Sequence, residues 1–217
     1  MSNSSLISYT NISPNRNSPR NHTIDTITIH CMAGQMTAKN CADMFAKSSA
    51  QASANYCIGY DGKIAMSVPE ADRSWCSSSG ANDHRAITIE VASDSTAPYA
   101  VKDAAYQSLL NLVTDICQRN NIKELKWVAD DKKYAGNPSV QNMTLHKWFA
   151  AKACPGAYLI GKMPEIAKTV NARLNPTTAS TTTYTVQCGA FSKKANADAY
   201  AKKIKAAGFD CYVTTKK

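Results

Sequence analysis

The order of apolar and polar positions predicts strands and helices that alternate along the first part of the chain. Residues 24–31, "IDTITIHC", form an apolar run rich in β-branched side chains, which is typical of a buried strand. Residues 37–47 begin with a threonine suited to a helix N-cap and continue with helical spacing. Residues 54–68 carry two short apolar runs around Asp61-Gly62, a dipeptide favoured in tight turns, and therefore predict a β-hairpin.

The same alternation continues to residue 174. Residues 85–93 predict a strand with aliphatic side chains on one face and Glu90 on the other. Residues 101–119 carry an apolar stripe at three- and four-residue spacing and predict an amphipathic helix. A further strand is expected near residues 126–130 and a closing helix over 157–174. This order predicts an α/β fold with a central mixed β-sheet flanked by helices.

The pattern breaks after residue 174. Residues 175–183, "NPTTASTTT", hold almost nothing that needs burial and predict a threonine-rich linker between a domain over 1–174 and a module over 184–217. The sequence of this module predicts a strand, a helix that begins after Ser192 and stops at Gly208, and a second strand. Together these make a small βαβ unit. It carries seven lysines against two aspartates, a net charge of +5, so we expect it to be the part that adheres to an anionic partner.

Composition narrows the function classes. With 217 residues, of which 44% are hydrophobic and 19% charged, the chain can bury a core and is neither disordered nor fibrous. Its start lacks the basic and apolar regions of a secretory signal, and no stretch is long enough to span a membrane, so we expect synthesis in a cytoplasm and no membrane insertion. The net charge of +9 suits an anionic polymer, but without a helix-turn-helix, a zinc finger or a basic run interleaved with aromatics, nucleic acid is disfavoured.

The eight cysteines are far apart in a chain of ordinary size, which argues against a disulfide framework. Five of them lie in apolar, periodic segments and are predicted to be reduced thiols in the core: Cys41, Cys57, Cys117, Cys188 and Cys211.

Three other residues suggest chemistry. A hydrolytic zinc ion usually has three protein ligands and an open fourth position, and His30, His146 and Cys154 can supply that set from well-separated segments. A cysteine nucleophile with His146 as its base is the rival chemistry, but it leaves His30 unexplained. The alternative without chemistry is that each residue simply packs in the core. A structural zinc site would need a fourth protein ligand, and Cys31 is a poor candidate because adjacent residues of a strand point to opposite faces.

Four motifs in order resemble a known family. These are "TIHCMAG", "SANYCIGYDGKI", "RSWCSSSGANDHRAITIEVAS" and "LHKWFAAKACPGAYL", and together they are similar to the zinc-dependent N-acetylmuramoyl-L-alanine amidases of type 2, which include many phage endolysins. The resemblance covers about residues 20 to 174 and implies the fold shared with peptidoglycan recognition proteins.

The resemblance implies roles for individual residues. His30, His146 and Cys154 would bind Zn²⁺, which activates water to attack the amide between N-acetylmuramic acid and L-alanine. Lys152 matches a family lysine that stabilises the developing oxyanion. Where some relatives use a tyrosine as the general base, this chain has Ala54, so the resemblance to the remaining members assigns that role to Glu90.

Two further residues match positions near the substrate groove. Trp75 matches a family tryptophan and is expected to stack on sugar or peptide, with core packing as the alternative. Asn82 is expected to contact the stem peptide, with a turn as the alternative.

The module over 184–217 resembles one half of a SPOR domain, a fold that binds septal peptidoglycan. A lone half cannot bury its own sheet well, so two chains are expected to pair their modules in a homodimer, or the module binds the wall as it is.

Together these features predict a zinc-dependent hydrolase of bacterial peptidoglycan. A phage or prophage endolysin fits the missing signal, because such an enzyme waits in the host cytoplasm before it reaches the cell wall. The alternatives are a bacterial autolysin exported by another route and a recognition protein that binds peptidoglycan without cutting it. Non-hydrolysing relatives usually lack the cysteine ligand, which is present here as Cys154.

Overall fold

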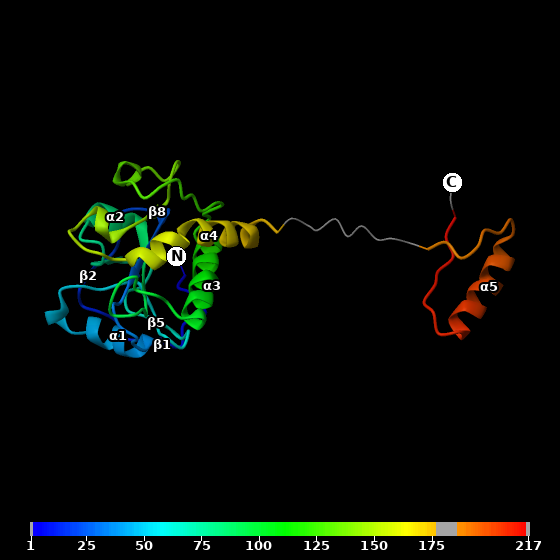
Figure 1. Cartoon of the computed structure of the whole chain (residues 1–217), viewed down its shortest axis with the longest axis horizontal. Helices are drawn as coiled ribbons and strands as arrows, with labels where there is room; N and C mark the ends of the chain where they lie inside the picture. Colours follow the sequence, from blue (N-terminus) through cyan, green and yellow to red (C-terminus); the bar gives the residue numbers. More distant parts are fainter. Residues whose placement is uncertain (1, 177–185, 216–217) are drawn as a thin grey trace. The chain divides into compact units, whose positions relative to one another are not determined.

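The computed structural model describes residues 2–176 and 186–215 (Figure 1). The chain divides into two compact units, Met1–Thr177 and Thr178–Lys217. The elements of the first unit are β1 (Tyr9–Thr10), β2 (Arg16–Asn17), β3 (Thr26–Cys31), α1 (Ala38–Phe45), η1 (Ser48–Ala50), β4 (Tyr56–Ile58), β5 (Ile64–Met66), β6 (Arg73–Ser74), α2 (Gly80–Arg85), β7 (Ala86–Val91), α3 (Asp103–Arg119), η2 (Lys132–Tyr134), β8 (Met143–Thr144), η3 (His146–Trp148) and α4 (Gly156–Leu174).

The first unit is built on a six-stranded sheet in the order β1-β5-β4-β7-β3-β8. Strand β7 is parallel to both β3 and β4, whereas β4 and β5 form the antiparallel hairpin expected around Asp61-Gly62. The sheet is therefore mixed and flanked by helices, as the sequence predicts. The helices expected over 37–47, 101–119 and 157–174 are confirmed as α1, α3 and α4.

Each face of the sheet is covered differently. Helices α3 and α4 lie side by side against one face (Figure 1) and enclose the main core, to which β7 contributes Ile87, Ile89 and Val91. On the other face, α1 packs on β4 and β5 around a smaller cluster that includes Cys41 and Cys57. Helix α1 therefore covers the part of the second face formed by β4 and β5.

The strand expected over residues 126–130 does not form. Backbone N–H groups there donate to side-chain amides instead, since Lys126 N bonds Asn142 Oδ1 and Val128 N bonds Gln141 Oε1, both at 2.7 Å. The sheet edge beside β3 is occupied by β8, which pairs at Ile27 with Met143. A short apolar run can therefore pair with side chains rather than with a strand.

A buried carboxylate fastens the N-terminal segment and α3 to the domain. Glu70 is fully buried and accepts hydrogen bonds from Arg119 at 2.6 and 2.9 Å, from Tyr56 Oη at 2.6 Å and from Asn120 at 3.0 Å. Its own N–H donates to Asn3 Oδ1 at 2.9 Å. The charge is thus paired and bonded on all sides, which a buried carboxylate requires.

Replacing Glu70 by alanine is expected to lower the free energy of unfolding by about 3–5 kcal/mol, because Arg119 loses its buried partner. The more exposed Asp115 would still pair with Arg119. Chemical denaturation measures this change. Lys39→Ala removes one partner of the exposed pair with Asp43 and is the matched control, with a much smaller expected loss. A loss as small for Glu70→Ala would show that the buried pair does not stabilise the domain.

The described part of the second unit holds the expected helix, α5 (Lys194–Ala206), but neither expected strand. Residues 186–191 and 209–215 are not paired as strands, and residues 177–185, with most of the expected linker, lie outside the described residues. The βαβ prediction is therefore wrong for the described residues, because two strands joined by a helix are parallel and need a further sheet to pair with. Six large apolar side chains are exposed on the described part of the module: Val186, Phe191, Tyr200, Phe209, Tyr212 and Val213.

Two smaller findings complete the description. Cys41, Cys57 and Cys117 are buried free thiols as predicted, whereas Cys188 is exposed and Cys211 half-buried, because the module has no core to receive them. Among the helices of the described residues, none combines the length and apolarity that a membrane crossing requires.

Candidate active site

Three segments meet beside the carboxyl end of β3. His30 is the penultimate residue of β3 and is fully buried. His146 opens η3, two residues after β8, and β8 lies along β3 through pairing of Thr28 with Thr144. Cys154 closes the next loop, in which Lys147 N donates to Cys154 O at 3.1 Å. The parallel pairing of β8 with β3 therefore brings the three predicted ligands together.

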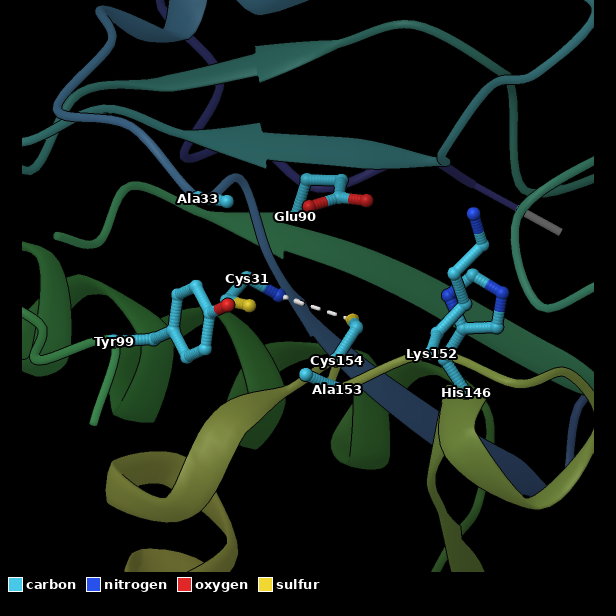
Figure 2. A pocket seen from close by; sticks show the side chains of 8 residues that line it. All are labelled: Cys31, Ala33, Glu90, Tyr99, His146, Lys152, Ala153 and Cys154. Carbon is cyan, nitrogen blue, oxygen red and sulfur yellow. Dashed lines mark hydrogen bonds between the residues drawn. The ribbon is translucent and has the colours of Figure 1, made fainter. Parts of the chain in front are cut away.

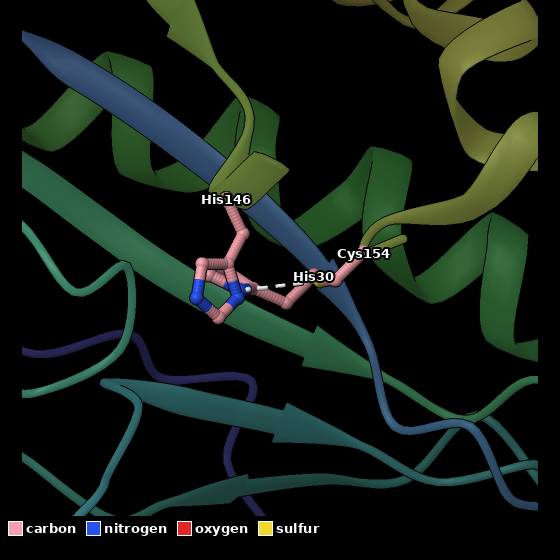
Figure 3. A group of neighbouring side chains, drawn as sticks. All are labelled: His30, His146 and Cys154. Atoms are coloured by element: carbon pink, nitrogen blue, oxygen red, sulfur yellow. Dashed lines mark hydrogen bonds between the residues drawn. The ribbon is translucent and has the colours of Figure 1, made fainter. Parts of the chain in front are cut away.

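Their donor atoms are spaced for a shared ion. One donor atom from each of His30, His146 and Cys154 lies within 4.8 Å of the others, and Figure 3 shows the three side chains converging. Cys154 Sγ is 3.4 Å from His30 Nδ1, close to the roughly 3.5 Å that separates a sulfur and a nitrogen bound to one tetrahedral zinc ion. Two histidines and a cysteine are also a donor set that zinc favours, so these residues fit the metal.

The environment keeps both imidazoles neutral, which metal binding requires. Burial, aided by the nearby His146, lowers the pKa of His30 to about 3. Burial also lowers the pKa of His146, with a further contribution from Lys152. His30 Nε2 is buried and has no hydrogen-bond partner among the described residues, whereas His146 Nε2 lies 3.3 Å from Ser78 Oγ.

Cys154 is held as a protein ligand would be. The backbone N–H of Cys31 donates to Cys154 Sγ at 3.4 Å, a contact that favours the thiolate. The thiol of Cys31 and burial act the other way and raise the pKa of Cys154. Without a metal the sulfur is therefore protonated at neutral pH, and binding of a cation would release that proton.

Glu90 lies directly beside the group formed by His30, His146 and Cys154. It is paired with His30 in the register of β3 and β7, and its Oε1 lies 4.0 Å from His30 Nδ1. Burial, and secondly the nearby Cys31, raises the pKa of Glu90 to about 8, and Oε2 has no hydrogen-bond partner among the described residues. A carboxyl group whose pKa lies near neutrality and which has a free oxygen is suited to accept and return a proton.

A second group of donors overlaps the first. His30, Cys76 and Glu90 also lie within 4.8 Å of one another, and Cys76 Sγ donates to Glu90 Oε1 at 3.9 Å. Burial and the charge of Glu90 raise the pKa of Cys76 well above its usual value. The two groups share only His30, so substitution of either cysteine distinguishes them.

Two cavities open on this region. The smaller, of about 310 Å³, is lined by Glu90, Cys154 and Tyr99 among others, and Figure 2 shows these side chains around it. The larger, of about 480 Å³, is lined by Trp75, Arg73 and Asp83 among others. Both include His146 and Lys152 in their walls, so the two cavities adjoin at the proposed metal site.

Lys152 and Trp75 line these cavities as a substrate-contacting role requires. Lys152 is exposed and stands beside His146 (Figure 2). The half-buried Trp75 ring lines the larger cavity, where its Nε1 donates to Asn17 Oδ1 at 2.7 Å. Both roles remain predictions that fit these positions.

Asn82 is placed differently. It lies in α2 and is buried, and its amide bonds Thr28 Oγ1 at 3.0 Å and Ser77 Oγ at 3.2 Å, while its Oδ1 accepts from Thr144 Oγ1 at 2.9 Å. It lines neither cavity. Its contacts tie α2 to β3 and β8, so a direct contact with substrate gains no support from its position.

Sequence reasoning overlooked Tyr99, which lines the smaller cavity. Tyr99 has a positive φ of 62°, an uncommon conformation for a bulky residue, with a cost of about 1–3 kcal/mol. A Cβ on Gly156 would come within 2.7 Å of its ring, so the glycine permits the contact. The only sequence signal is that the loop containing Tyr99 follows the strand that carries Glu90, and loops at carboxyl ends of parallel strands often carry function.

Comparison with known proteins agrees with this geometry. Residues 20–157, more than half of the chain, match the N-acetylmuramoyl-L-alanine amidase family model Amidase_2, and residues 180–217 match the SPOR domain model. Among curated protein sequences, none matches the chain.

Solved structures share the fold of the first unit. The catalytic domain of XlyA is 17% identical, with a TM-score of 0.55 over 76% of this chain and 99% of that one. The amidase LysC from Clostridium intestinale URNW is 18% identical, with a TM-score of 0.52 over 76% of this chain and 97% of that one. The Ph2119 endolysin from the Thermus scotoductus MAT2119 bacteriophage is 17% identical, with a TM-score of 0.51 over 70% of this chain and 89% of that one. With the family match and the site geometry, these likenesses lead to one conclusion: the chain belongs to the N-acetylmuramoyl-L-alanine amidase family and carries a SPOR domain at its C-terminal end.

Proposed function

We propose that this peptidoglycan amidase is zinc-dependent and cleaves the amide between N-acetylmuramic acid and L-alanine with the site built around His30. His30, His146 and Cys154 would hold the zinc ion. When bound, zinc would supply a Lewis acid that polarises the amide carbonyl and makes water more acidic. The observation that carries the proposal is the convergence of these three donors beside the half-buried carboxylate of Glu90.

Glu90 moves the proton in this proposal. Its carboxylate accepts a proton from the attacking water as the carbon–oxygen bond forms, and then delivers that proton to the nitrogen of the leaving amine. The raised pKa of Glu90 favours uptake of the proton from water, because it makes the carboxylate a stronger base. Lys152, which is exposed at the junction of the two cavities, would stabilise negative charge on the former carbonyl oxygen.

Digestion of purified peptidoglycan tests the proposal. The protein is incubated with and without a chelator, and new amino termini are identified. New L-alanine amino termini that disappear with the chelator and return with added zinc are expected. New reducing sugars, or cleavage that the chelator does not affect, would contradict it.

The SPOR domain would keep the enzyme on the wall, in keeping with the peptidoglycan binding that its family indicates. Its lysines suit an anionic polymer. The endolysins among the structural neighbours support a phage or prophage endolysin that lyses its host.

Pairing of two SPOR modules in a homodimer is the second part of this proposal. The exposed aromatic side chains Phe191, Tyr200 and Phe209 of the module would then be buried between copies. Analytical ultracentrifugation of the full chain is expected to give a dimer, and a variant that ends at residue 176 a monomer. A monomeric full chain whose module is still helical would contradict the pairing.

A further inference from the structure

Tyr99 forms one end of the smaller cavity. In Figure 2 the Tyr99 ring lies at the end of the cavity opposite His146 and Lys152, and its hydroxyl points toward the interior. Glu90 lies between the two ends. No hydrogen-bond partner of this hydroxyl is found among residues 2–176 and 186–215. A half-buried phenol that points into a cavity without a protein partner is free to bond a ligand.

The backbone around Tyr99 is fixed in this position. Tyr99 N donates to Thr96 O at 2.8 Å, and Pro98 O accepts from Tyr158 N, in the first turn of α4, at 3.0 Å. The ring also packs on Gly156, where an added Cβ would lie only 2.7 Å away. The loop is thus anchored to the helix that follows Cys154. These contacts hold Tyr99 at a positive backbone φ, which a bulky residue disfavours.

We propose that Tyr99 is a substrate-contacting residue that limits which group can occupy the smaller cavity and donates a hydrogen bond from its hydroxyl to the muropeptide. This inference rests on the proposed function for the identity of the ligand. A strained backbone conformation beside a cavity persists where the surrounding structure holds it. Here two backbone hydrogen bonds and the packing of the ring on Gly156 hold Tyr99 in place.

The lining of the cavity indicates which group Tyr99 meets. Beside Tyr99 the wall consists of the small side chains of Ala33, Ala153 and Cys31, whereas the charged Arg73 and Asp83 line the larger cavity. A small group with a methyl and a carbonyl suits the smaller cavity, and a bulky polar group suits the larger one. Tyr99 would therefore bond a polar atom close to the scissile amide, within the lactyl or alanyl part of the substrate.

Tyr99→Phe removes only the hydroxyl and tests the proposal. The Michaelis constant for solubilised peptidoglycan is expected to rise roughly three- to tenfold, the effect of one neutral hydrogen bond, with kcat within about twofold. Zinc content and the thermal midpoint should not change. Tyr134→Phe is the matched control, since Tyr134 lies in η2 and lines neither cavity.

Binding separates this inference from the amidase proposal. In a Glu90→Gln background, calorimetry with a soluble muropeptide of N-acetylmuramic acid and a tetrapeptide is expected to show three- to tenfold weaker binding for Tyr99→Phe. Tyr99→Gly, which allows positive φ and also removes the ring, should weaken binding further. If the wild type cuts nothing but these losses appear, the amidase proposal fails and the role of Tyr99 stands. Unchanged binding in both variants, no muropeptide binding at all, or loss of zinc from Tyr99→Phe would overturn it.

Discussion

Replacing Glu90 by glutamine is expected to lower turnover roughly a hundred- to ten-thousand-fold while the zinc content stays at one per chain, because the amide fills the same space but cannot take a proton. The expectation follows from the position of Glu90, whose Oε1 lies 4.0 Å from His30 Nδ1 and whose Oε2 has no partner within the described part of the chain. Release of L-alanine amino termini gives the rate, and elemental analysis gives the metal content.

Glu124→Gln is the matched control, since this exposed glutamate lies 3.8 Å from Lys126 and lines neither cavity. It should retain full activity. Full activity of Glu90→Gln would place the general base elsewhere. Loss of zinc from Glu90→Gln would instead make Glu90 a ligand, as the overlapping group of His30, Cys76 and Glu90 would allow.

Replacing Cys154 by serine is the second large effect. Loss of a residue that hydrogen-bonds to a metal ligand typically lowers metal affinity roughly 10–100-fold. We expect zinc affinity to fall by more than this, because serine removes a thiolate that would bind the metal itself. Activity should fall with zinc occupancy. Equilibrium competition with a chromogenic chelator measures the affinity.

Cys76→Ser separates the two possible donor groups in the same assay. Cys76 donates to Glu90 Oε1 and belongs only to the second group, so this variant should keep its zinc. Retained zinc in Cys154→Ser together with loss in Cys76→Ser would move the metal to the second group. Loss in both variants would show that the two sulfurs depend on one another.

The sequence allowed a large part of the catalytic unit to be predicted, for physical reasons. Strands β3 and β7 are buried on both faces and therefore consist of recognisable apolar runs. His30 and Glu90 interrupt those runs, and a polar residue in a buried strand requires an explanation that a surface residue does not. The resemblance of the motifs supplied that explanation, and the family match confirms the resemblance itself.

Other features depend on contacts that no local pattern encodes. Residues 126–130 look like a strand, but Asn142 and Gln141 occupy their N–H groups from a distant loop. Asn82 looks like a surface residue in "GANDHR", but it is buried by contacts with Thr28 and Thr144. The positive φ of Tyr99 depends on the approach of Gly156, which lies more than fifty positions further along the chain.

The register that sets His30 opposite Glu90 has a consequence for how this enzyme can be altered. Neighbouring strands lie about 4.8 Å apart whatever side chains they carry, so backbone hydrogen bonds fix the separation of these two residues at their Cα atoms. The length of the side chain at position 90 then sets the distance between its carboxylate and the imidazole of His30. Shortening Glu90 by one methylene would pull the carboxylate back toward the sheet, and nothing in the backbone could follow to close the gap. The pairing of β3 and β7 thus fixes the distance between these two backbone positions, and adaptation to a new substrate would have to come from the loops that follow the strands.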